Sequence, residues 1–407
     1  MRTVADLHQA NAFSVIRAIH ASGVRTRREL ARDTGLSFTT VASICGNLIQ
    51  QGVVKEAGLQ RSPIGRPTAT LLLNPDHGVF IGVDVAETYV LVETLDASLG
   101  PVSATRRDID PHKAAPGEVL ARVREAVLAE HARHDERRLL GVGLSVPGQI
   151  NQATGESVFA PYWGWRNIPV LDMLAPGVPA PLYLDNPLKA LVVSQVWTHP
   201  ERSQDDFAVI NLGTGVGAAF AIEGRVHRGS TNTAGEWGHT VLIADGRACR
   251  CGSRGCLEAY IGAPGILQTL REAHPESELL HSDDQAATLD ALSLAAARGE
   301  PAASDVLEQT AHFFGTAVAS MINFLNPSRI IVTGWVADKI GADLVQLASP
   351  HIKAHALAVP LMSTILETQP TGNSVCLGSA AQAFEGYLDS LLDSSRESPN
   401  DPQVAQA

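Results

Sequence analysis

Four potential metal ligands gather in one short stretch of this sequence. Cys249, Cys251 and Cys256 lie within eight residues, and His239 lies ten residues before the first of them. Three thiolates and one imidazole make the complete ligand set of a tetrahedral Cys3His zinc site. The alternative, a disulfide, would leave one cysteine over and would be unstable in a reducing compartment. The pattern predicts a structural zinc ion, because a full set of protein ligands leaves no open position for a catalytic water.

Two acidic residues flank the predicted zinc ligands. Glu236 lies in the run 234–239 (AGEWGH), and Glu258 lies two residues after Cys256. Carboxylates form strong charge-assisted hydrogen bonds, so a pair braced by zinc suits a polar ligand rich in hydroxyl groups. Either glutamate alone is more often a solvated surface residue. Their proximity to the metal favours a binding site.

A glycine-rich stretch at 211–218 (NLGTGVGA) joins two apolar strands. Glycine permits positive φ angles and lets backbone N–H groups approach an oxyanion, so Gly213, Gly215 and Gly217 are candidates for a phosphate-binding turn. A tight hairpin explains the same residues equally well. A dinucleotide-binding motif is the weaker interpretation, because no helix begins directly after the glycines.

Three helices are expected at the N-terminal end of the chain. Apolar residues at helical spacing place the first before Gly23, and a capping box of Thr26 and Glu29 starts the second. The third is expected over 37–51, after a turn of a few residues. Such a helix-turn-helix places the second helix of the pair in the major groove of DNA.

The third helix has one polar face, and two strands are expected at 53–73. The strands enclose a basic segment rich in glycine and proline, which predicts the wing of a winged helix-turn-helix. Arginines on a wing contact phosphates or enter the minor groove, although solvated residues show the same pattern. The residues predicted to contact DNA are Arg27, Ser37, Thr39, Thr40, Ser43, Asn47, Arg61 and Arg66.

The formal net charge of −12 is unevenly distributed. Residues 1–70 hold 9 Lys and Arg against 4 Asp and Glu, a balance of +5, which leaves −17 for the remainder. A basic end on an acidic chain indicates a nucleic-acid-binding segment, although a basic surface facing an acidic domain gives the same balance. No apolar stretch reaches the roughly 18 residues of a membrane span, and the start lacks the apolar run of a secretory signal, so a cytoplasmic protein is expected.

Beyond residue 78 strands and helices are mixed, as in α/β proteins. Strands are expected at 79–85, 89–94, 140–146, 181–184, 207–212 and 329–333. Helices are expected at 115–132, 187–197, 262–273, 286–298 and 302–325. The residues from 394 onward are polar and include two prolines, which predicts a disordered tail.

Over about 11–386 the chain resembles the ROK family of repressors, open reading frames and kinases. The run 236–239 (EWGH) with 249–258 (CRCGSRGCLE) is similar to the zinc and sugar signature of the family, and 65–67 (GRP) shortly before 81–84 (IGVD) is similar to its repressor branch. The resemblance implies a winged helix-turn-helix at 1–76 and an actin-like, RNase H-like sugar kinase fold of two lobes. The first lobe is expected at 77–196, completed by a helix at 378–393, and the second, zinc-bearing lobe at 197–377.

The resemblance also implies a ligand cleft between the lobes. His239 would bind zinc through one ring nitrogen and orient a sugar through the other. The expected partners are a monosaccharide or sugar derivative, operator DNA, and further copies of the chain in a homodimer or a dimer of dimers. The residues expected to hold the sugar are Gly148, Gln149, Asn186, Glu236, His239 and Glu258.

Three positions depart from the kinases of the family. Glu87 lies where those kinases carry a phosphate loop, Pro187 where they carry a catalytic aspartate, and Trp335 where they carry a glycine on the adenosine side. A negative charge disfavours ATP phosphates, and proline has no side chain that accepts a proton. We therefore expect a sugar-responsive repressor without kinase activity. The alternatives are an active sugar kinase with a DNA-binding domain, and a regulator whose effector is a protein that docks on the zinc lobe.

Overall fold

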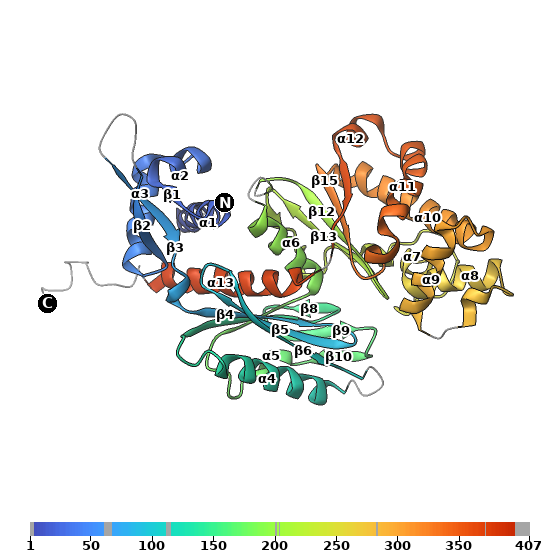
Figure 1. Ribbon diagram of the computed structural model, residues 1–407, viewed down its shortest axis with the longest axis horizontal. Coiled ribbons are helices and arrows are strands. Elements are labelled where there is room, and N and C mark those ends of the chain that lie inside the picture. Colours follow the sequence, from blue (N-terminus) through green and yellow to red (C-terminus); the bar gives the residue numbers. More distant parts are fainter. Residues whose placement is uncertain are drawn as a thin grey trace, which may run out of the picture.

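The computed structural model describes residues 4–60, 67–110, 115–199, 202, 204–281, 284–370 and 372–394. A small helical domain lies at one end of the long axis, and two lobes, each built on a five-stranded sheet, follow it (Figure 1). In the sequence, the strands of the first lobe lie between the helical domain and the second lobe. In this part of the chain no helix has both the length and the apolar character that crossing a bilayer requires.

The N-terminal domain is a winged helix-turn-helix, as predicted. Its helices are α1 (Val4–Ser22), α2 (Arg27–Thr34) and α3 (Phe38–Gln50), and the capping box is present, with the Thr26 N–H donating to the Glu29 carboxylate at 2.8 Å. β2 (Val54–Gln60) and β3 (Thr68–Leu73) form the antiparallel wing, and the unexpected strand β1 (Arg25–Thr26) pairs with β3. Arg61 and Arg66 lie outside the described residues, as does the predicted tail beyond residue 394.

The sheet of the first lobe has the order β11-β7-β4-β5-β6. β4 (Val79–Val85), β5 (Tyr89–Asp96) and β6 (Pro101–Asp108) are antiparallel, and β7 (Leu139–Ser145) and β11 (Leu182–Asp185) run parallel to β4. A small antiparallel sheet of β8 (Gln149–Asn151), β9 (Glu156–Ala160) and β10 (Trp165–Ile168) follows β7. Helices α4 (Pro116–Ala132) and α5 (Val170–Leu174) cover one face of the large sheet, and α13 (Ser374–Ser394) covers the other (Figure 1). Because both faces are covered, every residue of β4 and β7 is buried.

The C-terminal helix α13 approaches this sheet so closely that only glycine fits beneath it. A Cβ on Gly82 would lie 1.9 Å from the Cys376 carbonyl oxygen, and one on Gly143 would lie 1.8 Å from that of Ser379. On its other side α13 packs against α6 (Pro187–Thr198). Helix α13, the last helix of the described residues, is therefore built into the first lobe.

The second lobe repeats the strand arrangement of the first. Its sheet has the order β14-β13-β12-β15-β16, in which the first three strands are antiparallel and the last two run parallel to β12. Two sheets with one topology confirm the predicted two-lobed, actin-like architecture. The strands are β12 (Phe207–Leu212), β13 (Val216–Ile222), β14 (Arg225–Val226), β15 (Arg329–Thr333) and β16 (Ile365–Thr368); the helices are α7 (Glu258–Ile261), α8 (Ala263–Ala273), α9 (Gln285–Ala297), α10 (Pro301–Leu325), α11 (Ala337–His355) and α12 (Ala358–Ser363).

The predicted strands and helices of both lobes agree with the structure to within two residues at their ends, except that the helix predicted at 378–393 begins four residues earlier, at Ser374. The elements that the sequence pattern did not indicate lie mostly at the sheet edges and after β15. Among them are the edge strands β6 and β16, the small sheet β8 to β10, and helix α11.

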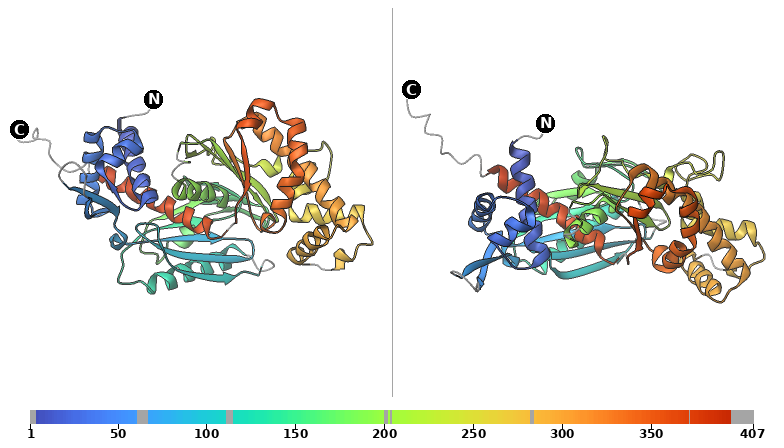
Figure 2. Two further views of the ribbon diagram at one scale, coloured as in Figure 1. Left: turned by 45° about the horizontal axis from the view of Figure 1, so that its top comes forward. Right: turned by 90° about the horizontal axis from the view of Figure 1, so that it is seen from above.

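The winged helix packs directly on the first lobe. One apolar core contains residues of α1, α3 and the wing together with Phe80, Trp197 and Phe384. The Phe384 ring lies 5.2 Å from that of Phe80 and 5.4 Å from that of Trp197, between centroids. Both views of Figure 2 show the N-terminal domain against α13. The winged helix and the first lobe therefore form one packed unit.

Candidate functional site

The four predicted metal ligands converge in the second lobe. The donor atoms of His239, Cys249, Cys251 and Cys256 all lie within 4.8 Å of one another. The sulfurs of Cys251 and Cys256 are 3.8 Å apart, and Nδ1 of His239 lies 3.6 Å from Sγ of Cys249. In a tetrahedral site with Zn–S bonds of about 2.3 Å, neighbouring sulfurs are about 3.8 Å apart. The donor set therefore has the composition and spacing that a tetrahedral cation such as zinc requires.

A tight backbone turn brings the three sulfurs together. The Cys249 N–H donates to the Ser253 carbonyl at 2.9 Å, and the Gly252 N–H donates back to the Cys249 carbonyl at 3.0 Å. Gly252 has a φ of 95°, which favours glycine. All five cysteines lie in the described part of the chain, and none forms a disulfide.

The protonation of the thiols links metal binding to pH. Burial raises the pKa of the Cys249 thiol to about 12 and also raises the pKa of Cys256. A metal binds the thiolate, so binding would release protons from these groups.

His239 connects the cluster to Glu236. Its Nδ1 faces the sulfur of Cys249, and its Nε2 lies 4.0 Å from Oε2 of Glu236. In this orientation Nδ1 faces the metal donors, and Nε2 faces the side where a ligand could bind. Burial raises the pKa of Glu236, whereas the charges of His239 and Lys189 act in the opposite direction.

Lys189 is a site residue that the sequence pattern did not indicate. It lies in the first turn of α6, is 2 % exposed and interacts electrostatically with both Asp185 and Glu236. Burial lowers the pKa of Lys189, and the two carboxylates act against this shift. The one available signal was a single charged residue in an otherwise uncharged helix.

Asn186 and Gly148 lie side by side at the start of α6. The Asn186 amide donates to the Gly148 carbonyl at 3.4 Å, and its Oδ1 caps the helix by accepting from the Lys189 N–H at 3.1 Å. β11 ends at Asp185, and Pro187 occupies the first turn of the helix. Proline has no backbone N–H to leave unpaired, so Pro187 suits this helix start.

A cavity of about 680 Å³ opens between the hairpin of β8 and β9 and the loop 228–233 of the second lobe. Of the six residues predicted to hold a sugar, Gln149 lines this cavity and the other five do not. The sequence pattern did not indicate the remaining polar lining, although a run of hydroxyl and amide residues at 230–233 was visible. This lining consists of Asn151, Gln152, Arg228, Ser230, Thr231, Asn232 and Thr233.

Asp185 joins the two lobes beside this cavity. Its carboxylate is fully buried and forms an ion pair with Arg228 of the second lobe. The Asn232 amide donates to it at 3.2 Å, and the Gln152 and Gln382 amides donate at 3.0 and 3.1 Å. A buried charge needs such a set of partners, so the lobes are held together at this point.

Glu258 has protein partners for both carboxylate oxygens. Nε of Arg250 donates to Oε1 at 2.9 Å, and the Val216 N–H donates to Oε2 at 3.0 Å. Arg250 also lies 3.8 Å from Oε1 of Glu87 in the first lobe. A sugar hydroxyl at Glu258 would therefore compete with Arg250.

The glycine-rich turn between β12 and β13 is a tight hairpin, in which the Gly213 N–H donates to the Gly215 carbonyl at 3.0 Å. None of its three glycines has a positive φ angle, so the turn does not use the backbone freedom of glycine. Their small size is what the structure requires. A Cβ on Gly213 would lie 3.2 Å from the Trp335 indole nitrogen, and one on Gly215 would lie 2.4 Å from the Arg250 guanidinium. Two side chains thus cover the turn where phosphate binding would need accessible N–H groups.

The structure describes six of the eight predicted DNA-contacting residues, and these six lie on and around α3. Thr39, Ser43 and Asn47 are exposed and recur about once per helical turn. Phe38, which the sequence pattern did not indicate, is 52 % exposed at the start of the helix. These side chains form the surface that a helix-turn-helix turns towards DNA.

The other three of these six residues have partners within the protein. The Ser37 hydroxyl caps α3 by accepting from the Thr40 N–H at 3.1 Å, and the two hydroxyl groups lie 2.8 Å apart. Arg27 lies 3.6 Å from the Glu56 carboxylate. Helix capping and an ion pair therefore explain part of this set without DNA.

Residues 80–382 match the model of the ROK family. The chain belongs to this family. It is 26% identical to the xylose repressor of Caldicellulosiruptor bescii over 80% of this chain and 83% of that protein. It is 31% identical to a glucokinase of Halalkalibacterium halodurans over 68% of this chain and 86% of that protein.

The solved structures extend the likeness to the winged helix. A ROK family transcriptional regulator, a homologue of the E. coli Mlc protein, has a TM-score of 0.80 and 23% identity, and the match covers 95% of this chain and 98% of that one. At this identity the match establishes the fold. The ROK match of this protein begins at residue 80, directly after the winged helix, so the winged helix lies outside the matched ROK module.

Proposed function

We propose that this ROK protein is a sugar-responsive, DNA-binding transcriptional regulator, a repressor of carbohydrate genes. The winged helix packed on the first lobe, with Thr39, Ser43 and Asn47 exposed on α3, is the observation that carries the proposal. The relative from Caldicellulosiruptor bescii, matched over 80% of this chain, is named a xylose repressor, which supports the same function.

The effector that we propose is a monosaccharide or a derivative of one. Hydroxyl and amide side chains of both lobes line the cavity between them. Asn186 donates to the Gly148 carbonyl, and Glu236, 4.0 Å from His239, interacts electrostatically with Lys189 of α6. Such groups recognise sugar hydroxyls through hydrogen bonds. We assign zinc to the Cys3His cluster, where it would fix the loops that carry Glu236 and Glu258 and leave the second nitrogen of His239 free for the ligand.

We propose further that the ROK module does not transfer phosphate. Trp335 and Arg250 cover the turn at 213–215, and Pro187 lies at the position of the base. Glu87 adds a negative charge where ATP phosphates would bind, and its neighbour is the Arg250 guanidinium. Phosphoryl transfer needs accessible N–H donors, a base, and surroundings without negative charge next to the ATP phosphates. Each change removes a different one of these requirements.

Sugar binding would act through the lobes. A ligand that competes with Arg250 for Glu258, or with Arg228 for Asp185, changes the contacts between the two lobes. In a dimer this would alter the separation of the two α3 helices and their fit to two half-sites. An exposed apolar patch on the second lobe supports self-association; it comprises Phe324, Leu357, Val359, Met362 and Ile365.

The decisive experiment measures DNA and sugar together. Purified protein is used to select duplexes from a random DNA library, and the affinity for the selected duplex is then measured with and without each of a panel of monosaccharides. We expect one sugar to change the affinity by about tenfold or more, as typical allosteric couplings do. The Glu236→Gln variant should keep DNA affinity and lose the sugar response. Failure to enrich any duplex would overturn the regulator proposal, and calorimetry that finds no binding sugar would favour a protein effector.

An active sugar kinase is the second candidate, favoured by the 31% identity to a glucokinase. ATP-dependent sugar phosphorylation by the unmodified protein tests it, with Pro187→Asp as the matched variant. Clear turnover by the unmodified chain would establish the kinase.

A further inference from the structure

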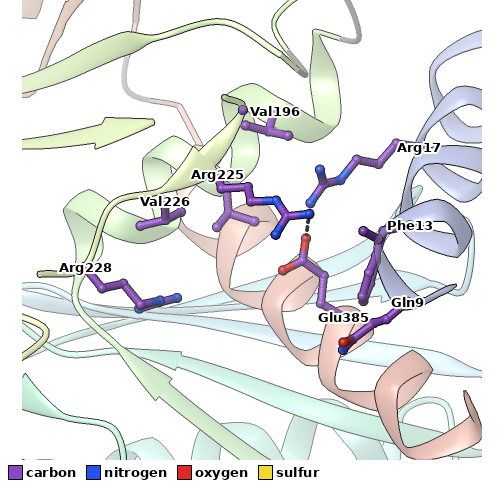
Figure 3. A pocket seen from close by; sticks show the side chains of 11 residues that line it. Gln9, Phe13, Arg17, Val196, Arg225, Val226, Arg228 and Glu385 are labelled. Atoms are coloured by element: carbon purple, nitrogen blue, oxygen red, sulfur yellow. Dashed lines mark hydrogen bonds and ion pairs between the residues drawn. The ribbon is translucent and has the colours of Figure 1, made fainter. Parts of the chain in front are cut away.

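A second cavity, of about 490 Å³, lies where the winged helix, the first lobe and the second lobe meet (Figure 3). Helix α1 forms one wall, α6 and α13 form another, and the end of the β13–β14 hairpin with the residues after it forms a third. Of the predicted site residues that the structure describes, none lines it. Arg228 lines both this cavity and the one between the lobes.

The cavity is rich in positive charge. Three guanidinium groups, those of Arg17, Arg225 and Arg228, line it together with a single carboxylate, Glu385. In Figure 3 the side chains of Arg17 and Arg225 come from opposite sides and point towards Glu385. The Arg17–Glu385 ion pair measures 2.8 Å, and Glu385 also accepts from the Trp197 indole N–H at 3.0 Å. One carboxylate thus serves several donors.

Two of the three arginines have hydrogen-bonding capacity left over. Arg225 is exposed and makes no ion pair with any described residue. Nε of Arg17 is buried and has no hydrogen-bond partner among the described residues. Arg228, in contrast, is engaged by Asp185. Like charges held close together repel each other unless an anion lies between them.

We propose that this cavity is a second ligand site, which binds the phosphate group of a small phosphate monoester. Guanidinium groups bind phosphate through paired N–H donors, and Arg17 and Arg225 approach from two sides. The volume exceeds that of a phosphate ion, and Phe13, Val193 and Val196 supply apolar surface for an organic group. The site does not depend on the proposed regulatory function.

A bound phosphate would connect parts of the protein that move separately in the proposed mechanism. Arg17 belongs to the first helix of the DNA-binding domain, and Arg225 belongs to the second lobe. Arg228 links the same cavity to Asp185, which precedes Asn186 at the start of α6. Occupancy would therefore fix the second lobe relative to the winged helix.

Calorimetric titration of the full-length, zinc-loaded protein without DNA tests the site, with three probes: inorganic phosphate, glucose 6-phosphate and uncharged glucose. We expect both phosphates to bind saturably and the monoester to bind more tightly. Arg225→Ala should weaken both by about tenfold, because one charged hydrogen-bonding partner is lost. Arg225 forms no ion pair with any residue that the structure describes, so its loss should leave the thermal midpoint unchanged.

Two further variants extend the test: one should tighten phosphate binding, and one should leave it unchanged. Glu385→Gln keeps an acceptor for Trp197 and removes the competing charge, so phosphate binding should become tighter. Arg271→Ala, an exposed arginine of α8, should change nothing. No saturable binding of either phosphate, equal binding by Arg225→Ala, or loss of binding in Glu236→Gln instead would overturn the proposal. Equal affinity for the two phosphates would overturn the assignment to a monoester. None of these outcomes bears on DNA binding.

Discussion

Cys256 is fully buried among the clustered metal donors, and its replacement isolates the contribution of the metal. We expect Cys256→Ala to reduce the zinc content from about one ion per chain to a small fraction of that. The thermal midpoint should fall by about 5–10 °C, since loss of a metal site is among the costliest single changes. Elemental analysis and thermal unfolding measure the two effects.

Cys45→Ala is the matched control. Cys45 is also fully buried, but it lies in α3 and far from the cluster in sequence. Its truncation should lower stability through a small cavity and leave the zinc content unchanged. Normal zinc content in Cys256→Ala would contradict the metal assignment.

Asp84 supplies a pH-dependent test at the same scale. It lies in β4, is 7 % exposed and accepts a hydrogen bond from the Tyr89 hydroxyl at 3.1 Å. Burial raises its pKa to about 6. The unfolded chain has a pKa near 4 at this residue, so the folded state holds the extra proton between these values and stability falls as the pH rises through them. The ionised carboxylate costs up to about 3 kcal/mol above that range.

Asp84→Asn should remove this cost and keep an acceptor for Tyr89. We expect the variant to have the higher thermal midpoint by about 5 °C near pH 7.5, about half that difference near pH 5, and nearly the same midpoint as the unmodified protein below about pH 3.5. Thermal unfolding over a pH series measures the difference. A difference that does not vary with pH would show that the Asp84 charge is not responsible.

The site residues differ in how far sequence could predict them. The metal ligands fall in one short run, so their type and spacing indicate the chemistry without any knowledge of the fold. Arg250 with Glu87, and Arg228 with Asp185, become neighbours only when two lobes meet. No local pattern marks such pairs, and Lys189 is informative only after burial is known.

At the scale of single elements, α3 carries the prediction for DNA. Ser43 is exposed in the middle of its polar face. Ser43→Glu places a negative charge against the phosphates and bases of the major groove, so we expect the affinity for selected DNA to fall by at least about tenfold. The thermal midpoint should stay the same. Fluorescence anisotropy with a labelled duplex measures the affinity, and DNA binding that survives the substitution would exclude α3 as the recognition helix.

Helix α13 carries the second prediction at this scale. Gly82→Ala would place a Cβ 1.9 Å from the Cys376 carbonyl, so backbone has to move. We expect a loss of about 3 kcal/mol or more in the free energy of unfolding, measured with urea. Gly117→Ala in α4 is the control, because nothing lies within 4 Å of its Cβ, and alanine should leave stability equal or higher. Equal effects of the two would contradict the close packing of α13.

Physical reasons explain why the sequence pattern did not indicate some of the elements. β6 exposes most of its residues, so it lacks the apolar alternation that indicates a strand. Helix α11 contains Pro350, which argues against a helix in a sequence pattern. The buried central strands and capped helices, in contrast, carry their signals in their own residues.

For the whole molecule, the core shared by the winged helix and the first lobe predicts joint unfolding. Removal of residues 1–77 would expose the apolar surface around Phe80, Trp197 and Phe384. We expect the truncated protein to aggregate or to unfold at a lower temperature than the full chain. Size-exclusion chromatography and calorimetry measure this. A soluble truncated chain with an unchanged thermal midpoint would show that the shared core contributes little.

The same shared core limits how such proteins can be recombined. A chimera that took only its winged helix from another ROK protein would join two halves of a core whose side chains differ in shape, and mismatched cores lose stability. Exchange of DNA specificity is therefore expected to succeed by grafting the exposed face of α3 alone, or by transferring the winged helix together with α13. Helix α13 follows the second lobe in the sequence, so the exchangeable unit consists of two segments that are separated by most of the ROK module.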